Sequence, residues 1–347
     1  QAMVDCIAPQ PGERITDPAC GTGGFLFTAH NYITTHNKSL TRDQLKHLKE
    51  KAFTGYELVQ GTARVCAMNM MLHGIGSEKS VPVVVGDALA ADPGERFEVV
   101  LANPPFGKKS STVIVGEDGR TSTEKDTIER DDFWATTSNK QLNFVQHIKT
   151  LLATHGRAAV VLPDNVLFEG GAGETIRKKL LHECDVHTLL RLPTGLFYAQ
   201  GVKANVLFFE KKGASETPWT KRLWIYDLRT NKHFTLKTSP LTRADLNEFV
   251  ELYQAGNRHQ RQATWSPDVD STKGCGPDGR WRAYSYDELA ARDKTSLDIF
   301  WLKDDSLADS DNLPAPGVIA LEIVEDLQAA LEQFKLIAGD LAEEAID

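Results

Sequence analysis

Short apolar runs alternate with segments of helical periodicity along the first 212 residues. The runs have the length of buried strands and end in turn residues, and they cover 12–17, 52–57, 81–89, 96–107, 157–163, 186–193 and 203–212. Segments such as 140–156 and 173–185 carry apolar residues at the spacing of a helix. Strands that alternate with helices predict an α/β fold with an open, mostly parallel sheet of seven strands. Sheets of this kind bind ligands at the carboxyl ends of their strands.

Three stretches depart from this alternation. Residues 108–139 are polar and charged without periodicity, which predicts a mobile loop. Beyond residue 212, a stretch at 222–229 is compatible with one more strand, whereas 256–284 are rich in Gly, Pro, Arg and Trp and predict irregular structure. We therefore divide the chain into a first domain over 1–212, an irregular extension over 213–316 and a terminal helix over 317–347.

The terminal stretch 317–346 carries apolar residues at alternating spacings of three and four. They are Val324, Leu327, Leu331, Phe334, Ala338 and Leu341. This is a heptad seam. Two interpretations remain open, a helix packed on its own domain and a coiled-coil contact with a partner.

Composition narrows the class of protein. The chain has 347 residues, 41% hydrophobic and 25% charged, as in soluble globular proteins. No apolar run approaches the roughly 20 residues that span a bilayer, so we expect no membrane contact. The five cysteines form no C-x-x-C pair, which argues against a zinc site or a disulfide framework and favours the reducing cytoplasm. We predict no metal site.

A glycine-rich turn follows the first strand, in the stretch DPACGTGGF at 17–25. Glycines adopt positive φ and let a backbone approach a ligand closely, and the pattern is near a dinucleotide-binding fingerprint. Glu57 and Asp87 end the second and third strands. A carboxylate at the first position can accept hydrogen bonds from ribose hydroxyls, and one at the second can accept from an adenine amino group.

The fourth strand ends in LANPPFGKK at 101–109. Neither proline can donate a hydrogen bond, each fixes its own φ, and the residue before a proline is held extended. The result is a stiff corner that sets one amide, Asn103, and one ring, Phe106, in fixed relative positions. Asp17, Glu57, Asp87 and Asn103 alone could each be a surface group or a helix cap. At four consecutive strand ends they are expected to meet at one rim.

These motifs together carry a family resemblance. DPACGTGGFL, VVLANPPFG, RAAVVLPDNVLFEGGAGETIRKKLL and LLRLPTGLFYAQGVKANVLFFEK resemble the N6-adenine DNA methyltransferases, and most closely the methylation subunits of type I restriction–modification systems. The resemblance is strong over 1–212 and continues through 280–302 into the terminal helix. It implies a Rossmann-like S-adenosylmethionine-dependent methyltransferase fold with a C-terminal helical extension. It also implies site-specific methyl transfer to N6 of adenine in duplex DNA.

The resemblance assigns residue roles as well. The side-chain oxygen of Asn103 and the backbone carbonyl of Pro104 would accept the two N6 hydrogens, and Phe106 would stack on an adenine flipped from the duplex. The catalytic set is Asn103, Pro104, Pro105 and Phe106. The cofactor-binding set is Asp17, Pro18, Ala19, Cys20, Gly21, Thr22, Gly23, Gly24, Phe25, Glu57, Asp87, Ala88 and Asn103. In the family a further cofactor motif would lie upstream of Gln1.

Partners follow from the same resemblance. The chain would work with a specificity subunit, with two methylation subunits in each complex, and in some systems with a restriction subunit. A net charge of −9 agrees with this dependence, because a protein that grips DNA alone usually carries a basic face. Two alternatives remain open. The chain could be a protein-glutamine or RNA amino-methyltransferase that shares the NPPF tetrapeptide, or a non-catalytic subunit that keeps the fold for assembly.

Overall fold

The computed structural model describes residues 1–304 except 78–79, 107–110, 116–120, 126, 195, 197–202, 233, 236–238 and 273. For 111–115 and 121–125 it describes the backbone alone. Residues Gln1–Leu302 form one compact unit. The predicted terminal helix over 317–347, with its heptad seam, lies outside the described residues. Within the described part, no helix combines the length and the apolarity that crossing a membrane requires.

A single sheet of nine strands runs through the unit, in the order β11-β10-β8-β9-β7-β4-β1-β2-β3. The strands are β1 (Ile15–Asp17), β2 (Phe53–Glu57), β3 (Val83–Val85), β4 (Phe97–Ala102), β7 (Leu152–Pro163), β8 (Cys184–Arg191), β9 (Ala204–Lys211), β10 (Arg222–Asp227) and β11 (Trp281–Ser285). β9 runs antiparallel to both neighbours and β11 runs antiparallel to β10, and the other pairs are parallel. The predicted α/β fold with a mostly parallel sheet is confirmed. The sheet holds the seven predicted strands and two more.

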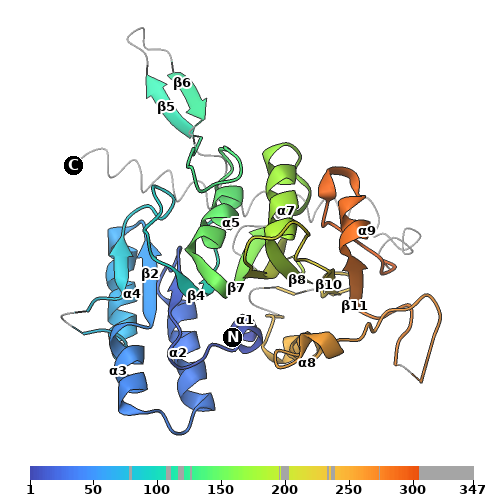
Figure 1. The fold of residues 1–347 in the computed structure, drawn as a ribbon, viewed down its shortest axis with the longest axis horizontal. Helices are drawn as coiled ribbons and strands as arrows, with labels where there is room; N and C mark the ends of the chain where they lie inside the picture. Colours follow the sequence, from blue (N-terminus) through green and yellow to red (C-terminus); the bar gives the residue numbers. More distant parts are fainter. Residues whose placement is uncertain are drawn as a thin grey trace, which may run out of the picture. The chain divides into compact units, whose positions relative to one another are not determined.

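Helices cover both faces of this sheet. They are α1 (Ala2–Ile7), α2 (Gly24–His36), α3 (Arg42–Glu50), α4 (Gln60–Leu72), α5 (Lys140–Leu151), α6 (Asn165–Phe168), α7 (Ala172–Glu183), α8 (Asn247–Tyr253) and α9 (Tyr286–Ala290), with 3-10 turns η1 (Ala244–Leu246), η2 (Arg258–Gln260) and η3 (Asp293–Thr295). In Figure 1, α5, α7 and α9 stand on one side of the central strands, and α1 and α8 lie on the other. Two apolar clusters fill the two interfaces. One joins α1–α4 and α8 to the sheet, and the other joins α5–α7 and α9 to it.

The extension beyond residue 212 is built into the sheet. β10 pairs in parallel with β8, and β11 closes the edge against β10. Trp281 of β11 is fully buried and stacks on Trp224 of β10 with 5.3 Å between ring centroids. Residues 213–302 therefore belong to the same compact unit as 1–212. The expected division at residue 212 does not appear there, because the added strands share one apolar core with the first seven.

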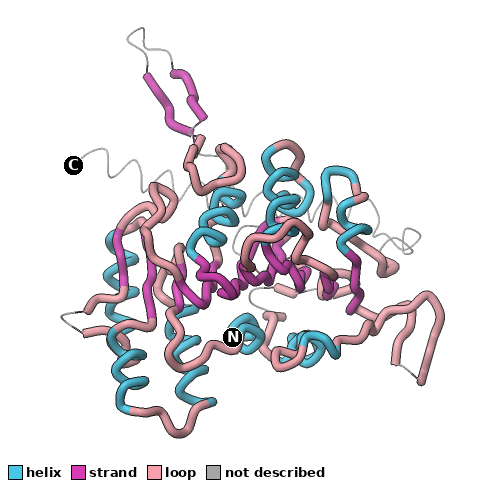
Figure 2. Tube along the Cα trace, viewed as in Figure 1, coloured by secondary structure: helices cyan, strands magenta, loops and turns pink. Residues whose placement is uncertain are grey.

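The segment 108–139 is not the structureless loop that its polarity predicts. β5 (Ser111–Val115) and β6 (Thr121–Lys125) pair antiparallel in a separate two-stranded sheet, visible as a pair of strands in Figure 2. Closer to α5, Ile128 and Thr137 form a β-bridge, and Arg130 makes two hydrogen bonds to Asp132. Such side-chain contacts leave no periodic signal in the sequence, which is why the pattern indicated a loop.

Candidate functional site

The order of the strands reverses between β1 and β4. From β1 the chain proceeds outward through β2 to β3, and then returns to the opposite side of β1 to form β4. In open α/β sheets, ligands bind outside the carboxyl ends of the strands at such a switch point. Asp17 is the last residue of β1, and Asn103 follows the end of β4. The two motifs singled out in the sequence therefore flank the switch point.

A cavity of about 480 Å³ opens at these strand ends. Its described lining residues are Pro18, Ala19, Tyr56, Glu57, Leu58, Gly86, Asp87, Ala88, Leu89, Asn103, Pro105, Ile128, Lys140 and Phe144. The volume lies within the range of small-molecule sites, about 300–1,000 Å³. Three of the four predicted rim groups, Glu57, Asp87 and Asn103, meet at this one cavity.

The fourth rim group, Asp17, is not among the described lining residues of the cavity. Its side chain is buried, and Oδ1 accepts a hydrogen bond of 2.9 Å from the backbone N–H of Ala19. Burial raises the pKa of the Asp17 carboxyl to about 7, against the lowering effect of that hydrogen bond. Asp17 thus shapes the turn that follows β1. In that turn Gly21 and Gly23 have φ of +53° and +89°, a region that favours glycine.

Glu57 joins this turn to the beginning of α4. Its Oε2 accepts from the N–H of Gly21 at 3.0 Å, and its Oε1 accepts from the N–H of Val59 at 2.9 Å. The backbone carbonyl of Glu57 also accepts from the N–H of Gly86, which ties the end of β3 to the end of β2. Because a carboxylate has about four lone-pair positions, both oxygens can still accept a hydrogen bond from a ligand.

The third rim turn follows β3. Oδ1 of the exposed Asp87 accepts from the N–H of Leu89 at 2.9 Å, which folds the turn so that Ala88 and Leu89 line the cavity. Arg130 donates to the carbonyl of Leu89 at 3.2 Å and thereby ties this turn to the segment before α5. The Asp87 carboxylate can accept a hydrogen bond from a flat ring, and the apolar side chains of Ala88 and Leu89 can pack against it.

Exposed and buried residues alternate in the corner after β4. Asn103 and Pro105 are exposed and line the cavity, whereas Pro104 is buried. Phe106 is half-buried and packs against the apolar cluster of the α1–α4 face. Pro104 and Phe106 are not among the described lining residues.

The remaining predicted cofactor residues lie in the turn and the first residues of α2. Cys20, Gly21, Thr22, Gly23, Gly24 and Phe25 are not among the described lining residues of the cavity. Cys20 Sγ lies 3.7 Å from Cys66 Sγ, and this contact together with burial raises the pKa of the Cys20 thiol. A neutral buried thiol is inert as a nucleophile. A side chain at position 23 would clash, because a Cβ there would lie 2.9 Å from Cys66 Sγ.

Sequence reasoning missed six of the lining residues. They are Tyr56, Leu58, Gly86, Ile128, Lys140 and Phe144. Lys140 and Phe144 are four residues apart on α5, and this spacing places them on one face of a helix. That signal was present in the sequence, but nothing in it indicated that the face looks onto the strand ends.

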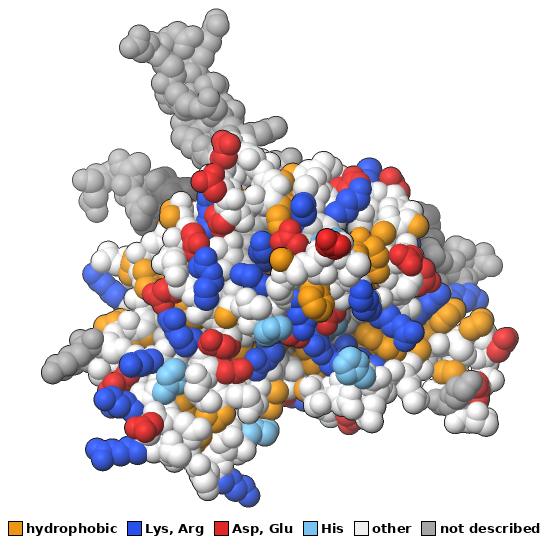
Figure 3. Space-filling model, in the orientation of Figure 1, with side chains coloured by type: hydrophobic (Ala, Val, Ile, Leu, Met, Phe, Trp, Pro, Cys, Tyr) orange, Lys and Arg blue, Asp and Glu red, His pale blue; other side chains and the backbone are white. Residues whose placement is uncertain are grey.

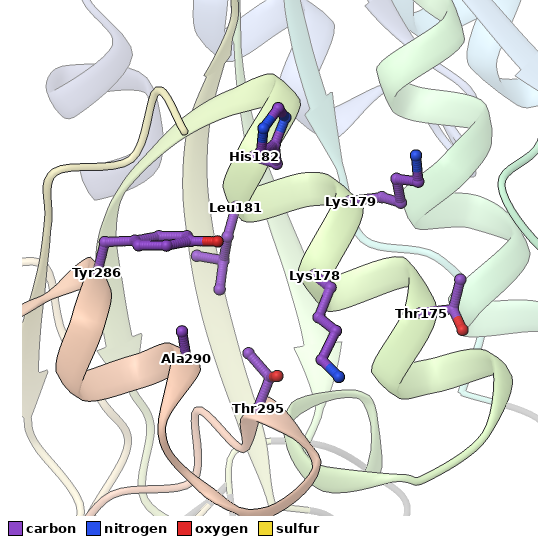
Figure 4. A pocket seen from close by; sticks show the side chains of 8 residues that line it. All are labelled: Thr175, Lys178, Lys179, Leu181, His182, Tyr286, Ala290 and Thr295. Atoms are coloured by element: carbon purple, nitrogen blue, oxygen red, sulfur yellow. The ribbon is translucent and has the colours of Figure 1, made fainter. Parts of the chain in front are cut away.

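A second cavity of about 410 Å³ lies between α7, α9 and η3 (Figure 4). Its described lining residues are Thr175, Lys178, Lys179, Leu181, His182, Tyr286, Ala290 and Thr295. It shares no described lining residue with the strand-end cavity and contains no carboxylate among those residues. Over the described residues, no three His, Cys, Asp or Glu side chains gather to hold a metal ion. The strand-end cavity is therefore the candidate site.

Comparisons with known proteins show which family the chain resembles. The family model described as N-6 DNA Methylase matches residues 1–273. The chain is 39% identical over 371 aligned residues to the type I restriction enzyme EcoKI methylase subunit of Escherichia coli K12. It is 40% identical over 368 aligned residues to the StySPI methylase subunit of Salmonella potsdam. Each alignment covers 98% of this chain and 66% of the relative.

A solved structure has the same fold. The crystal structure of the EcoKI M protein superposes with a TM-score of 0.73 at 38% sequence identity, covering 96% of this chain and 69% of that chain. The chain thus spans about two thirds of the length of the relatives it matches.

Proposed function

Because the chain belongs to the N-6 DNA methylase family, we propose that it is the catalytic part of a site-specific adenine-N6 DNA methyltransferase. It would use S-adenosylmethionine and act as the modification subunit of a type I restriction–modification complex. The observation that carries the proposal is the position of Asn103 at the switch point. There it lines the same cavity as Glu57 and Asp87.

The cavity offers hydrogen-bond acceptors that suit this cofactor. Glu57 would accept from the ribose hydroxyls and Asp87 from the adenine amino group, with Leu58, Leu89 and Phe144 against the faces of the purine ring. The turn from Asp17 to Phe25 would surround the methionine end. The two positive-φ glycines in that turn fit this role, because they let the backbone come close to the ligand.

Bound S-adenosylmethionine supplies an electrophilic methyl group on a positively charged sulfur. The chain's own task is to make the adenine amine nucleophilic, because its lone pair is delocalised into the ring. The side-chain oxygen of Asn103 accepts one N6 hydrogen and the backbone carbonyl of Pro104 accepts the other, which localises the lone pair. The nitrogen would take the methyl group as the carbon–sulfur bond breaks, which would leave the thioether S-adenosylhomocysteine, and the methylated nitrogen would release one proton to water.

Phe106 supports the flipped base by stacking. Extrusion of a base costs a few kcal/mol, and stacking on an aromatic side chain returns about 1–3 kcal/mol. No covalent intermediate is needed, so the rate depends on positioning and on fixed hydrogen-bond acceptors. The rigid Asn-Pro-Pro corner suits that task.

Sequence recognition and much of the grip on DNA would come from other chains. The net charge is −9, and on the face seen in Figure 3 basic and acidic side chains are interspersed. Duplex binding depends on neutralising phosphates with Lys and Arg. We propose a complex of two such chains with one specificity subunit, which a restriction subunit can join.

The test combines cofactor binding with methyl transfer. The complete polypeptide is assembled with its specificity subunit and supplied with radiolabelled cofactor and duplex DNA, and N6-methyladenine is quantified after digestion. Asn103→Ala should lower methyl transfer by about 100- to 1,000-fold, comparable to the loss of one fixed hydrogen-bond partner of a transition state. It should leave the calorimetric Kd for S-adenosylmethionine within about threefold, because Asn103 serves mainly the target base.

Two variants complete the experiment. Asp17→Ala should weaken cofactor binding sharply, because the turn loses the carboxylate that shapes it. Asn247→Ala, on the exposed side of α8, should change neither quantity. Methyl transfer by the wild-type complex to an acceptor other than adenine N6, or full activity of Asn103→Ala, would refute the proposal.

A further inference from the structure

Helix α5 is almost completely buried, although it is rich in polar residues. Ten of its twelve residues are buried. The buried polar ones are Gln141, Asn143, Gln146, His147 and Thr150. A buried polar group costs free energy unless it has a hydrogen-bond partner, so the partners of these side chains indicate what the helix holds in place.

Four of the five side chains hold the segment 130–137. Gln146 accepts from the N–H of Ala135 at 2.9 Å and donates to its carbonyl at 3.0 Å. Asn143 donates to the carbonyl of Thr137 at 2.9 Å. The other two contact the same segment, Thr150 through Asp132 and His147 through Arg130. This network is local, because α5 follows that segment directly in the chain.

Gln141 reaches a different part of the molecule. Its Nε2 donates a hydrogen bond of 3.1 Å to the backbone carbonyl of Pro105. Gln141 is buried whereas Pro105 is exposed, so the bond is partly shielded from water. Both neighbours of Pro105 in the corner, Pro104 and Phe106, have roles in the proposed reaction. The bond therefore connects α5 to the reacting part of the site.

The direction of that carbonyl depends on a torsion that the prolines leave free. The proline rings fix φ at Pro104 and Pro105. Because Asn103 and Pro104 each precede a proline, their ψ angles are held extended. The ψ of Pro105 has no such restraint, and together with the φ and side-chain torsions of Phe106 it sets where the Phe106 ring lies relative to the Asn103 amide. A hydrogen bond to the Pro105 carbonyl restrains that ψ.

We propose that Gln141 is a positioning residue that sets Phe106 against the target adenine by holding the Pro105 carbonyl. The inference rests on the proposed function, since it assigns Gln141 to the methyl-transfer step. Gln141 touches neither base nor cofactor in this role. It acts through the backbone of the corner, so it should affect the turnover of bound DNA and leave cofactor affinity unchanged.

The experiment replaces the donor by a side chain of similar shape. Gln141→Met in the complete polypeptide, assembled with its specificity subunit, should lower kcat by about 10- to 100-fold, as expected when a reacting group is misplaced by about 1 Å. The Kd for S-adenosylmethionine should stay within twofold.

The matched control is Gln146→Met, which removes a second buried amide from the same helix. Its hydrogen bonds go to Ala135 and Asn143, and not to the corner. This variant measures how far kcat falls when α5 loses a buried amide that does not contact the corner. Its kcat should stay within about threefold of the wild-type value. Equal losses of kcat in the two variants, or wild-type kcat in Gln141→Met, would overturn the inference.

A measurement that does not depend on methyl transfer separates this inference from the proposed function. Phe106 is replaced by 4-fluorophenylalanine, and its fluorine resonance is recorded in the complex. Gln141→Met should shift or broaden that resonance, whereas Gln146→Met should leave it in place. An unchanged resonance overturns the inference even if the complex methylates adenine. A changed resonance in a complex that transfers no methyl group refutes the proposed function alone.

Discussion

Asp17, Glu57 and Asp87 each accept hydrogen bonds from backbone N–H groups of the turns at the strand ends. Asp17 accepts from Ala19, Glu57 accepts from Gly21 and Val59, and Asp87 accepts from Leu89. Residues that would meet a cofactor therefore also hold the turns in which they lie. A substitution at one of these three carboxylates is therefore expected to change the shape of the site as well as its direct contact with a ligand.

The buried carboxyl of Asp17 should make stability depend on pH. Its pKa is raised to about 7 in the folded chain, against about 3.9 in an unfolded chain. Between these values the folded state retains a proton that the unfolded state has lost, so the free energy of unfolding falls as pH rises. Asp17→Asn removes this dependence while its side-chain oxygen can still accept from Ala19. The stability of the variant relative to wild type should rise by up to about 4 kcal/mol between pH 4 and pH 8.

Chemical denaturation of both proteins at several pH values measures this difference. The gain should level off above pH 7, where the folded carboxyl is ionised. Parallel stability curves for the two proteins would mean that Asp17 is already ionised in the folded state at pH 4.

At the scale of elements, two packing arrangements decide what surrounds the site. α5 brings Lys140 and Phe144 to the cavity and Gln141 to the corner after β4. β10 and β11 extend the sheet beyond β8 and bury Trp224 and Trp281 in one stack. The first arrangement builds the site, and the second stabilises the sheet that carries it.

Removal of the buried ring in β11 should destabilise the whole unit. Trp281→Ala leaves a cavity against Trp224 and Phe249, and such changes cost about 3–5 kcal/mol. Thermal unfolding should remain a single transition at a lower midpoint, because β11 shares its core with the other strands. Trp219→Ala is the control, since that side chain is 36% exposed and should cost much less. A separate early transition would show instead that β10 and β11 unfold independently.

The whole molecule is one compact unit as far as Leu302. A chain that ends at residue 212 would expose the edge of β8, which β10 covers, together with apolar surface of the core. Exposed strand edges promote aggregation. We therefore expect 1–212 to be insoluble or unstable, whereas 1–304 should unfold cooperatively. Soluble yield and circular dichroism melting compare the two, and a stable 1–212 fragment would restore the division expected there.

Local pattern was sufficient to predict that Glu57, Asp87 and Asn103 meet at one edge of the sheet. Apolar runs that end in Asp17, Glu57, Asp87 and Asn103 identify strand ends, and the carboxyl ends of parallel strands lie at one edge of a sheet. The Pro-Pro corner is equally local, because proline restricts only itself and its predecessor. These features, and the α/β class, depend on interactions between residues close in the chain.

The tertiary structure alone decided which distant residues complete the site. Lys140 and Phe144 face the cavity, Gln141 holds Pro105, and β11 closes the sheet edge because of how helices and strands pack. Packing depends on the shapes of surfaces far apart in sequence, which no periodicity encodes. The sequence by itself therefore determined the strand ends and their chemistry. The tertiary structure decided the walls of the cavity and the helix that sets the geometry of the corner.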